Sequence, residues 1–321
     1  MSFPTPKMIK TNDIDMAVYE AGPADGIPVM LLHGFAELAY SWRHQLPALA
    51  EAGYHVLAPD QRGYGLTSRP PAVEDYDIDQ LTGDLIGLLD AYGIAKAVFC
   101  GHGIGGSVAW AMPLLYEARV KGVIGVNAPF VPRPAIDPIL AARAEYGDNI
   151  YIAEFQKPGE AEAVLEKDVA RSFRFFMRKN AITLEEFRAA PKDNNNLSLL
   201  LSFKLDEAQW QGEPLLTQEE LRVFVDAFSR TGFTPALNWY RNFTRNWRRM
   251  EKVEQKIKLP GLLIMAENDI LSPPAAAKGM EAFVPDLEGA LIYGSGPWTQ
   301  QEYPYRTNAI MIDWLKRRFI A

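Results

Sequence analysis

Short apolar runs that alternate with longer helical patterns between residues 27 and 126 constrain the fold of this chain more than any other feature. The apolar runs, each four residues long, are Val29–Leu32, His55–Ala58, Ala97–Cys100 and Val123–Val126. Most of them lead into Gly-containing turns or into stretches with helical periodicity, such as Ile78–Tyr92. Parallel strands joined by crossover helices produce this alternation. The sequence therefore predicts an α/β fold with a mostly parallel central sheet and helices on both faces.

The alternation breaks at a group of prolines, namely Pro129, Pro132, Pro134 and Pro138. From there to about residue 250 the chain has helical patterns and polar turns but no convincing buried strand, which indicates an inserted helical region. Apolar runs at Gly261–Ala266 and Gly289–Tyr293 then resume the sheet, and an amphipathic stretch follows at Tyr305–Phe319. We therefore predict an α/β core over residues 1–131 and 251–321, with a helical cap over residues 132–250.

Composition and charge exclude several classes of protein. The chain has 321 residues, 48% of them hydrophobic, which is enough for a large core and a second small domain. Its formal net charge of -7 argues against a nucleic-acid partner, because such affinity depends on clustered Lys and Arg. No stretch approaches the roughly 20 apolar residues that span a bilayer, so we expect no membrane segment. Cys100 is the single cysteine, which fits a reducing compartment and an expected cytoplasmic location.

A glycine-rich turn, residues 101–106 (Gly-His-Gly-Ile-Gly-Gly), directly follows an apolar run and precedes a helical pattern. A nucleophile elbow needs small residues at this spacing, because its central residue lies on a strained strand-to-helix turn where larger neighbours would collide. Ser, Cys or Asp is typical of the central position, which here is Gly103. The same letters fit a dinucleotide-binding fingerprint. That pattern belongs after the first strand of its unit, however, and at least two strands precede this one.

Two further segments resemble a known family. His33-Gly34-Phe35 ends a predicted strand, and residues 60–65 (Asp-Gln-Arg-Gly-Tyr-Gly) follow the next one. Together with the elbow they resemble the epoxide hydrolases and their haloalkane and haloacetate dehalogenase relatives within the α/β-hydrolases. The resemblance implies an oxyanion hole formed by the backbone N–H groups of Phe35 and Ile104, which requires no side chain. It implies neither an organic cofactor nor a metal.

Two tyrosines in the inserted region match the cap tyrosines of epoxide hydrolases. Tyr151 stands four residues before Phe155, and Tyr240 lies in the segment Leu-Asn-Trp-Tyr-Arg-Asn. Phenols are protonated at neutral pH, so a pair of them can donate two hydrogen bonds to an epoxide oxygen as the ring opens. The resemblance therefore implies a small hydrophobic molecule, an epoxide, as the binding partner, and we expect Trp239 and Trp298 to contact it.

The family mechanism requires an Asp nucleophile, a His that activates water and an acid that orients the His. Asp269 follows a late predicted strand and matches the acid. The nucleophile position is Gly103 and the base position is Pro297, so neither group is present. The other candidates are less suited, because His33, His102 and Glu37 stand in motif positions that serve backbone shape, and Cys100 belongs to a buried strand. Ordinary covalent hydrolysis of an epoxide is therefore predicted to be absent.

Three hypotheses remain open. The chain could open or rearrange an epoxide without a covalent intermediate, using its tyrosines and a nucleophile within the substrate. It could be a pseudoenzyme that holds a hydrophobic molecule between cap and core. It could also be an altered copy of an ordinary epoxide hydrolase, since both departures fall on the two catalytic positions. A homodimer is compatible with each hypothesis.

Overall fold

A computed structural model describes residues 3–179, 181–190 and 197–319. Within these ranges, eight strands form one sheet in the order β1-β2-β4-β3-β5-β6-β9-β10. Their bounds are β1 (Lys7–Thr11), β2 (Ile14–Ala21), β3 (Pro28–Leu32), β4 (His55–Pro59), β5 (Ala97–His102), β6 (Val120–Val126), β9 (Gly261–Ala266) and β10 (Leu287–Ile292). The strands from β4 through β10 along the sheet are parallel, and β1 and β2 pair in the antiparallel direction at one edge. The predicted mostly parallel sheet is therefore confirmed.

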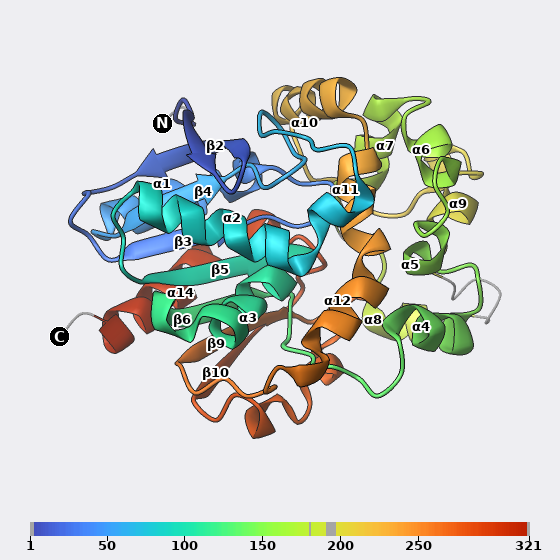
Figure 1. The fold of residues 1–321 in the computed structure, drawn as a ribbon. Helices are drawn as coiled ribbons and strands as arrows, with labels where there is room; N and C mark the ends of the chain where they lie inside the picture. Colours follow the sequence, from blue (N-terminus) through green and yellow to red (C-terminus); the bar gives the residue numbers. More distant parts are fainter. Residues whose placement is uncertain (1–2, 180, 191–196, 320–321) are drawn as a thin grey trace.

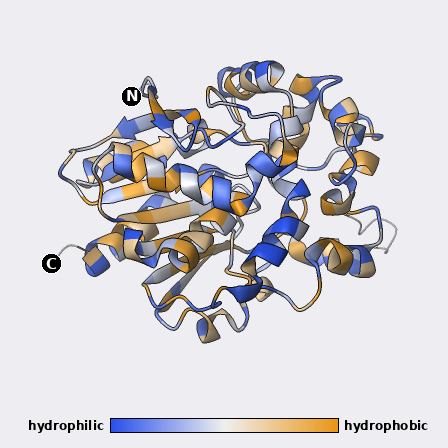
Figure 2. Cartoon of the chain, viewed as in Figure 1, coloured by the Kyte–Doolittle hydropathy of each residue, from blue (hydrophilic) through white to orange (hydrophobic). Residues whose placement is uncertain are grey.

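Helices cover both faces of this sheet. In the core they are α1 (Gln45–Glu51), α2 (Ile78–Ala91), α3 (Ile104–Tyr116), α13 (Thr299–Glu302) and α14 (Pro304–Phe319). One hydrophobic cluster joins α2 and α3 to Met30 and Leu32, whereas a second joins α1 and α14 to Val29 and Leu31. Successive side chains of β3 thus point to opposite faces, as the pleat requires. Figure 1 shows α3 and α14 on opposite sides of the sheet, and Figure 2 shows the apolar character of its central strands.

The edge hairpin formed by β1 and β2 was not among the strands predicted from the sequence. Asn12 and Asp13 connect the two strands, and both have positive φ, at 43° and 62°. Two adjacent residues with positive φ make the type I′ turn that suits the twist of a hairpin, and Asn and Asp tolerate this conformation. The turn signal is present in the sequence, but both strands around it are partly exposed.

The segment between β6 and β9 consists mainly of short helices. They are α4 (Pro138–Tyr146), α5 (Tyr151–Glu154), α6 (Glu160–Leu165), α7 (Val169–Phe176), α8 (Leu184–Ala189), α9 (Leu199–Ser202), α10 (Gln218–Thr231), α11 (Thr234–Arg241) and α12 (Phe243–Arg249), with a two-strand ribbon of β7 (Arg178–Lys179) and β8 (Glu213–Pro214). These helices occupy the right side of Figure 1, beside the sheet. The exact boundaries of a separate cap, residues 132–250, stay a prediction.

Several contacts attach these helices to loops that follow core strands. Trp239 Nε1 on α11 donates to the carbonyl of Arg62 at 3.2 Å, after β4. On α12, Arg245 pairs with Asp77 at 2.8 Å. The carboxyl ends of parallel strands meet at one edge of a sheet, so the helices cover the edge where α/β proteins bind ligands.

Candidate functional site

The glycine-rich turn between β5 and α3 has the backbone shape of an elbow. Gly103 precedes the first residue of α3 and has φ 52° and ψ −125°. A Cβ on Gly101 would lie 2.3 Å from the carbonyl oxygen of Gly105, and a Cβ on Gly106 would lie 2.2 Å from the Cβ of Ala128. A Cβ on Gly103 would meet no atom within 4 Å. The neighbouring glycines are therefore needed for close approach, whereas the direction of a side chain at 103 leads into open space.

The two backbone N–H groups expected to form an oxyanion hole are free to bind a ligand. Phe35 follows β3, and Ile104 is the first residue of α3, so neither amide has an intrahelical or ladder partner. Among the described residues, neither amide donates to another group. Ala36, next to Phe35, has φ 57°, a left-handed conformation that alanine rarely adopts. This strained turn is compatible with a role of the amides at the site.

His33 cannot act as a free base in this arrangement, because both ring nitrogens are occupied. Nδ1 lies 3.0 Å from the carbonyl of Gly34 and must donate to it, while Nε2 accepts from the amide of Gln61 at 3.0 Å. These two bonds define the neutral tautomer of His33. Burial lowers the pKa of His33, which keeps the ring neutral.

His102 forms a buried pair with Glu37 directly beneath the elbow. Its Nδ1 lies 2.6 Å from Glu37 Oε2, and its Nε2 lies 2.7 Å from the carbonyl oxygen of Pro297. Because a carbonyl oxygen only accepts, Nε2 must donate to it. Burial alone would lower the pKa of His102, but the Glu37 carboxylate and the Pro297 carbonyl raise it. With Glu37 ionised, both nitrogens donate and His102 is an imidazolium, which leaves no lone pair for general-base catalysis.

The surroundings of Glu37 support its ionised form. Oε2 also accepts from the amide of Gly34 at 2.7 Å, and Oε1 accepts from the side chains of Gln300 and Gln301 at 2.9 and 3.1 Å. Burial would raise the pKa of Glu37, yet the charge and hydrogen bond of His102 and the amide of Gly34 lower it. The sequence analysis did not identify Gln300 and Gln301 as members of the site. Their only sequence signal is their position just after the expected base loop.

Asp269, the predicted acid, is buried and has three donors of its own. Oδ2 accepts from Asn127 Nδ2 at 2.8 Å, and Oδ1 accepts from the amides of Leu271 and Ser272 at 2.9 and 3.0 Å. The same Asn127 amide lies 3.3 Å from the carbonyl of Gly296 and so connects the acid to the loop that carries residue 297. Burial raises the pKa of Asp269, and the hydrogen bonds oppose this shift. The carboxylate is thus satisfied without a histidine.

Tyr151 on α5 and Tyr240 on α11 lie side by side. Their ring centroids are 6.0 Å apart and the rings are close to perpendicular. The Tyr240 ring also packs edge-on against Phe35 at 5.4 Å and Phe155 at 5.0 Å. Within the described ranges, neither hydroxyl has a hydrogen-bond partner. The structure therefore places Tyr240 against the predicted oxyanion turn and Tyr151 beside Tyr240.

Both phenols are strongly held in the protonated form. Burial raises the pKa of Tyr151, and the Asp269 carboxylate raises it further. Burial also raises the pKa of Tyr240 well above its ordinary value, and neighbouring Tyr151 adds to this effect. At neutral pH each hydroxyl is therefore a hydrogen-bond donor, and the part of the chain that the structure describes offers it no acceptor.

The two tryptophans expected to contact substrate have different positions. Trp298 lies beside the site, with its ring centroid 5.7 Å from that of His102 and its Nε1 donating to the carbonyl of Phe176 at 2.8 Å. Trp239 is 2% exposed and packs edge-on against Tyr64 at 5.6 Å. Its indole N–H is already bonded to the Arg62 carbonyl. Trp239 therefore packs α11 onto the core, which differs from the expected substrate contact.

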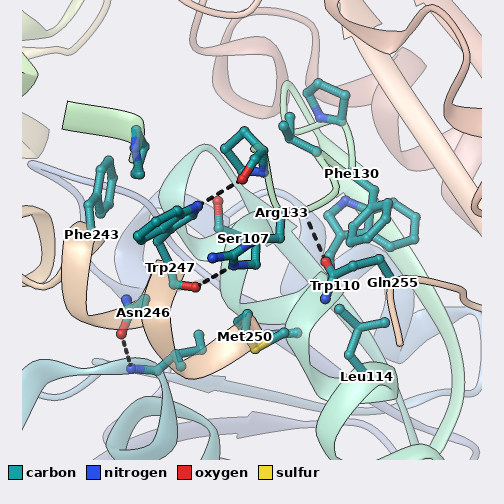
Figure 3. Close-up of a pocket in the computed structure, with 16 residues that line it drawn as sticks. Ser107, Trp110, Leu114, Phe130, Arg133, Phe243, Asn246, Trp247, Met250 and Gln255 are labelled. Carbon is teal, nitrogen blue, oxygen red and sulfur yellow. Dashed lines mark hydrogen bonds between the residues drawn. The ribbon is translucent and has the colours of Figure 1, made fainter. Parts of the chain in front are cut away.

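A pocket of about 260 Å³ lies away from these residues, on the outer side of α3. Ser107 and Trp110 of α3 and Trp247 of α12 are among the residues that line it (Figure 3). Arg133 stacks on Trp247 at 4.2 Å from the ring centre and donates through Nε to the Trp247 carbonyl at 2.7 Å. In return, Trp247 Nε1 donates to the carbonyl of Pro134 at 2.8 Å. These reciprocal bonds attach α12 to the segment that leaves β6.

Comparisons with known proteins agree with this geometry. A family model described as the alpha/beta hydrolase fold matches residues 27–304. Epoxide hydrolase A of Mycobacterium tuberculosis is 42% identical over 98% of each chain. Bifunctional epoxide hydrolase 2 of Mus musculus is 40% identical over 92% of this chain, which spans about half of that protein. Among solved structures, epoxide hydrolase A from Mycobacterium thermoresistibile superposes with a TM-score of 0.86 at 41% identity over 98% of each chain.

The parallel sheet, the turn after β5 and the helices inserted after β6 define the class of this protein as an α/β-hydrolase fold. Within that class, the chain belongs to the epoxide hydrolase family. In the part of the chain that the structure describes, no helix is long and apolar enough to cross a membrane.

Proposed function

We propose that this protein binds a small hydrophobic epoxide between core and cap and activates its oxygen with hydrogen bonds from Tyr151 and Tyr240, without forming a covalent ester. One observation carries the proposal. Two adjacent phenols, Tyr240 buried and Tyr151 partly buried, are held protonated, and among the described residues neither hydroxyl has a hydrogen-bond partner. Two neighbouring hydroxyl groups that can donate and are not engaged by the protein suit a ligand oxygen that accepts two hydrogen bonds.

The ordinary two-step hydrolysis has no nucleophile and no base in this chain. Gly103 offers no carboxylate, and Pro297 has no side-chain nitrogen. The two histidines nearest the site, His33 and His102, have both ring nitrogens engaged. Ring opening therefore needs a nucleophile that the protein does not supply. A hydroxyl group within the substrate satisfies this requirement: its oxygen attacks an epoxide carbon, and the epoxide C–O bond breaks with its electron pair on the ring oxygen. That oxygen takes a proton from a tyrosine, the attacking hydroxyl loses its proton to solvent, and the tyrosinate recovers a proton from solvent.

Ligand binding without turnover is a second candidate function. It is favoured by the open space at Gly103, where the family has its nucleophile. An ordinary epoxide hydrolase in which only positions 103 and 297 had been altered would also have this structure. The oxyanion-hole role of Phe35 and Ile104, the cytoplasmic location and a homodimer complete the proposal as expectations from the sequence.

The proposal is tested with a panel of aryl and alkyl epoxides and with epoxy alcohols that can cyclise. Binding is measured by calorimetry, and products are identified by chromatography and mass spectrometry. We expect cyclic ether from the epoxy alcohols and loss of both binding and product in the double variant Tyr151→Phe/Tyr240→Phe. Tyr305 is 90% exposed, so Tyr305→Phe is a matched control. Tight binding with no product supports the second candidate, and unchanged binding in the double variant contradicts both.

A second test concerns the assignment of positions 103 and 297 as those of the nucleophile and the base in an epoxide hydrolase. The double variant Gly103→Asp/Pro297→His should form diols from simple epoxides, because Asp269 already lies next to the loop that carries residue 297. Each substitution alone should leave the protein unable to complete both steps, since catalytic groups that act as a unit are not additive. If the double variant folds and binds epoxides but forms no diol, the assignment of these two positions is wrong.

A further inference from the structure

The direction of a side chain at Gly103 leads into open space beside the first residue of α3. A Cβ at this position would meet no atom within 4 Å. The amides of Phe35 and Ile104 have no partner among the described residues. Ile104 also begins α3, a helix of 13 residues whose aligned peptide dipoles place partial positive charge at this end. The arrangement favours a small anion.

The tyrosine pair provides an independent indication of a ligand. Tyr240 is 7% exposed, its hydroxyl has no partner in the described ranges, and its ring packs edge-on against Phe35 at 5.4 Å. A protonated hydroxyl that the protein leaves unengaged can donate to an acceptor from outside the chain. His102, one residue before Gly103, adds a positive charge beneath the turn.

The two carboxylates already present do not exclude a third. Glu37 is paired with His102 and accepts from Gly34, while Asp269 accepts from Asn127 and two backbone amides. The resemblance to epoxide hydrolases implies an Asp side chain at position 103 beside the same acid. The scaffold is therefore of a kind that accommodates a carboxylate here, and what this chain lacks is only the covalent link that holds it.

We infer that the space at Gly103 binds a free small carboxylate, which opens the epoxide held by Tyr151 and Tyr240 and leaves as a hydroxy ester. The protein would then join a carboxylic acid to an epoxide. This inference rests on the proposed function, because it uses the same tyrosine pair to activate the epoxide. The inference also accounts for the two positions that differ from the family pattern. Glycine at 103 makes room for the free acid, and proline at 297 removes the base that would activate water.

The bonds balance without a further reagent. One carboxylate oxygen forms a bond to an epoxide carbon, and the C–O bond of the ring breaks with its electron pair on the ring oxygen. That oxygen takes the proton of a tyrosine hydroxyl, and the tyrosinate recovers a proton from solvent. The sum is carboxylate plus epoxide plus one proton, giving a 2-hydroxyalkyl ester. Because the ester is not attached to the protein, it dissociates as product.

The experiment uses the full chain, an aryl epoxide and sodium acetate in a buffer free of other carboxylates. Small ligands have few atoms to bind with, so we expect acetate to act at about millimolar concentration or above. The rate of 2-hydroxyalkyl acetate formation should rise with acetate, saturate, and exceed the rate without protein at least tenfold. Acetate labelled with ¹⁸O in both oxygens should place both labels in the ester.

Variants at two glycines separate the site from the fold. Gly103→Asn puts a neutral side chain into the space and should abolish the saturable response to acetate. Gly93→Asn is the matched control, because Gly93 also has positive φ, 65°, and open space around its Cβ. Saturation-transfer NMR of formate with the unaltered protein, displaced by acetate, needs no variant and covers the case in which Gly103→Asn fails to fold.

The outcomes are distinct from those of the proposed function. If epoxides bind in a tyrosine-dependent way but acetate neither saturates the rate nor gives a saturation-transfer signal, the carboxylate site is refuted and the proposed function stands. If no epoxide binds, the proposed function fails, and a formate signal that Gly103→Asn removes would still support the anion site. An acetate response that is equal in Gly103→Asn and in the unaltered protein overturns the inference.

Discussion

Gly103→Ala tests the open space at the elbow through its effect on stability. The backbone at Gly103 has φ 52° and ψ −125°, which is strained for any residue with a Cβ, at a cost of about 1–3 kcal/mol. No atom lies within 4 Å of the new methyl group, so no clash is added. The substitution also restricts the unfolded chain, which offsets about 0.4–1 kcal/mol. We expect a net loss of about 1–2 kcal/mol in the free energy of unfolding.

Gly105→Ala gives the contrast within the same turn. Its Cβ would lie 2.2 Å from the carbonyl oxygen of His33 and 2.6 Å from that of Leu32. Both are backbone atoms that cannot rotate away, so the backbone of α3 or β3 must shift. The cost should reach or exceed the upper end of the about 1–3 kcal/mol that is typical of overpacking.

Urea unfolding followed by tryptophan fluorescence measures both variants against the unaltered protein. An unchanged dependence on urea concentration would show that the difference is one of stability. If Gly103→Ala costs as much as Gly105→Ala or more, the space at Gly103 is closed. The arguments for a ligand at that position then fail as well.

Three further predictions concern other parts of the structure. His102→Gln should cost about 3–5 kcal/mol at pH 6, because Glu37 would remain buried without its cation. The pKa of His102 is raised above 6.5 and that of Glu37 is lowered below 4.5, so the pair stabilises fully between these pH values. The stabilisation is lost as pH rises through the folded pKa of His102, and urea unfolding at pH 9 should show a smaller difference between the two proteins. Trp247→Phe removes the donor to the Pro134 carbonyl and should lower the free energy of unfolding by about 0.5–1.5 kcal/mol, measured in the same way. Cys100 is buried, and burial raises the pKa of its thiol, so iodoacetamide should leave it unmodified until the protein unfolds, as mass spectrometry would show.

The parallel part of the fold could be predicted because each strand carries its own signal. The run at Gly261–Ala266 is an apolar hexapeptide, and β9 occupies the same residues. The edge hairpin was not predicted, since β1 is largely exposed and the apolar run Met16–Tyr19 of β2 is not followed by a helical pattern. A strand that is buried on both faces has a continuous apolar run, which is easier to recognise in a sequence than the mixed pattern of an edge strand.

The candidate site could be predicted in its residue types but not in its bonding. Motif spacing placed Tyr151 and Tyr240 together, and the structure has them side by side. No pattern along the chain indicates that His102 donates to the carbonyl of residue 297, since 195 positions separate the two. Trp239 was expected to contact substrate as an aromatic residue of the inserted region, and its residue type alone does not indicate which way it faces. Adjacent residues on a helix point about 100° apart, and Trp239 faces the core.

The shape of the site is maintained by groups other than the two that are missing. Close approaches between glycine and backbone hold the elbow, and the Glu37–His102 pair binds the base loop through a carbonyl oxygen, which any residue at 297 provides. Asp269 obtains its donors from Asn127 and from backbone amides. Since none of these bonds uses a side chain at 103 or 297, replacing both residues removes chemistry without removing a structural contact. The same independence means that an Asp and a His restored there should find the geometry already in place.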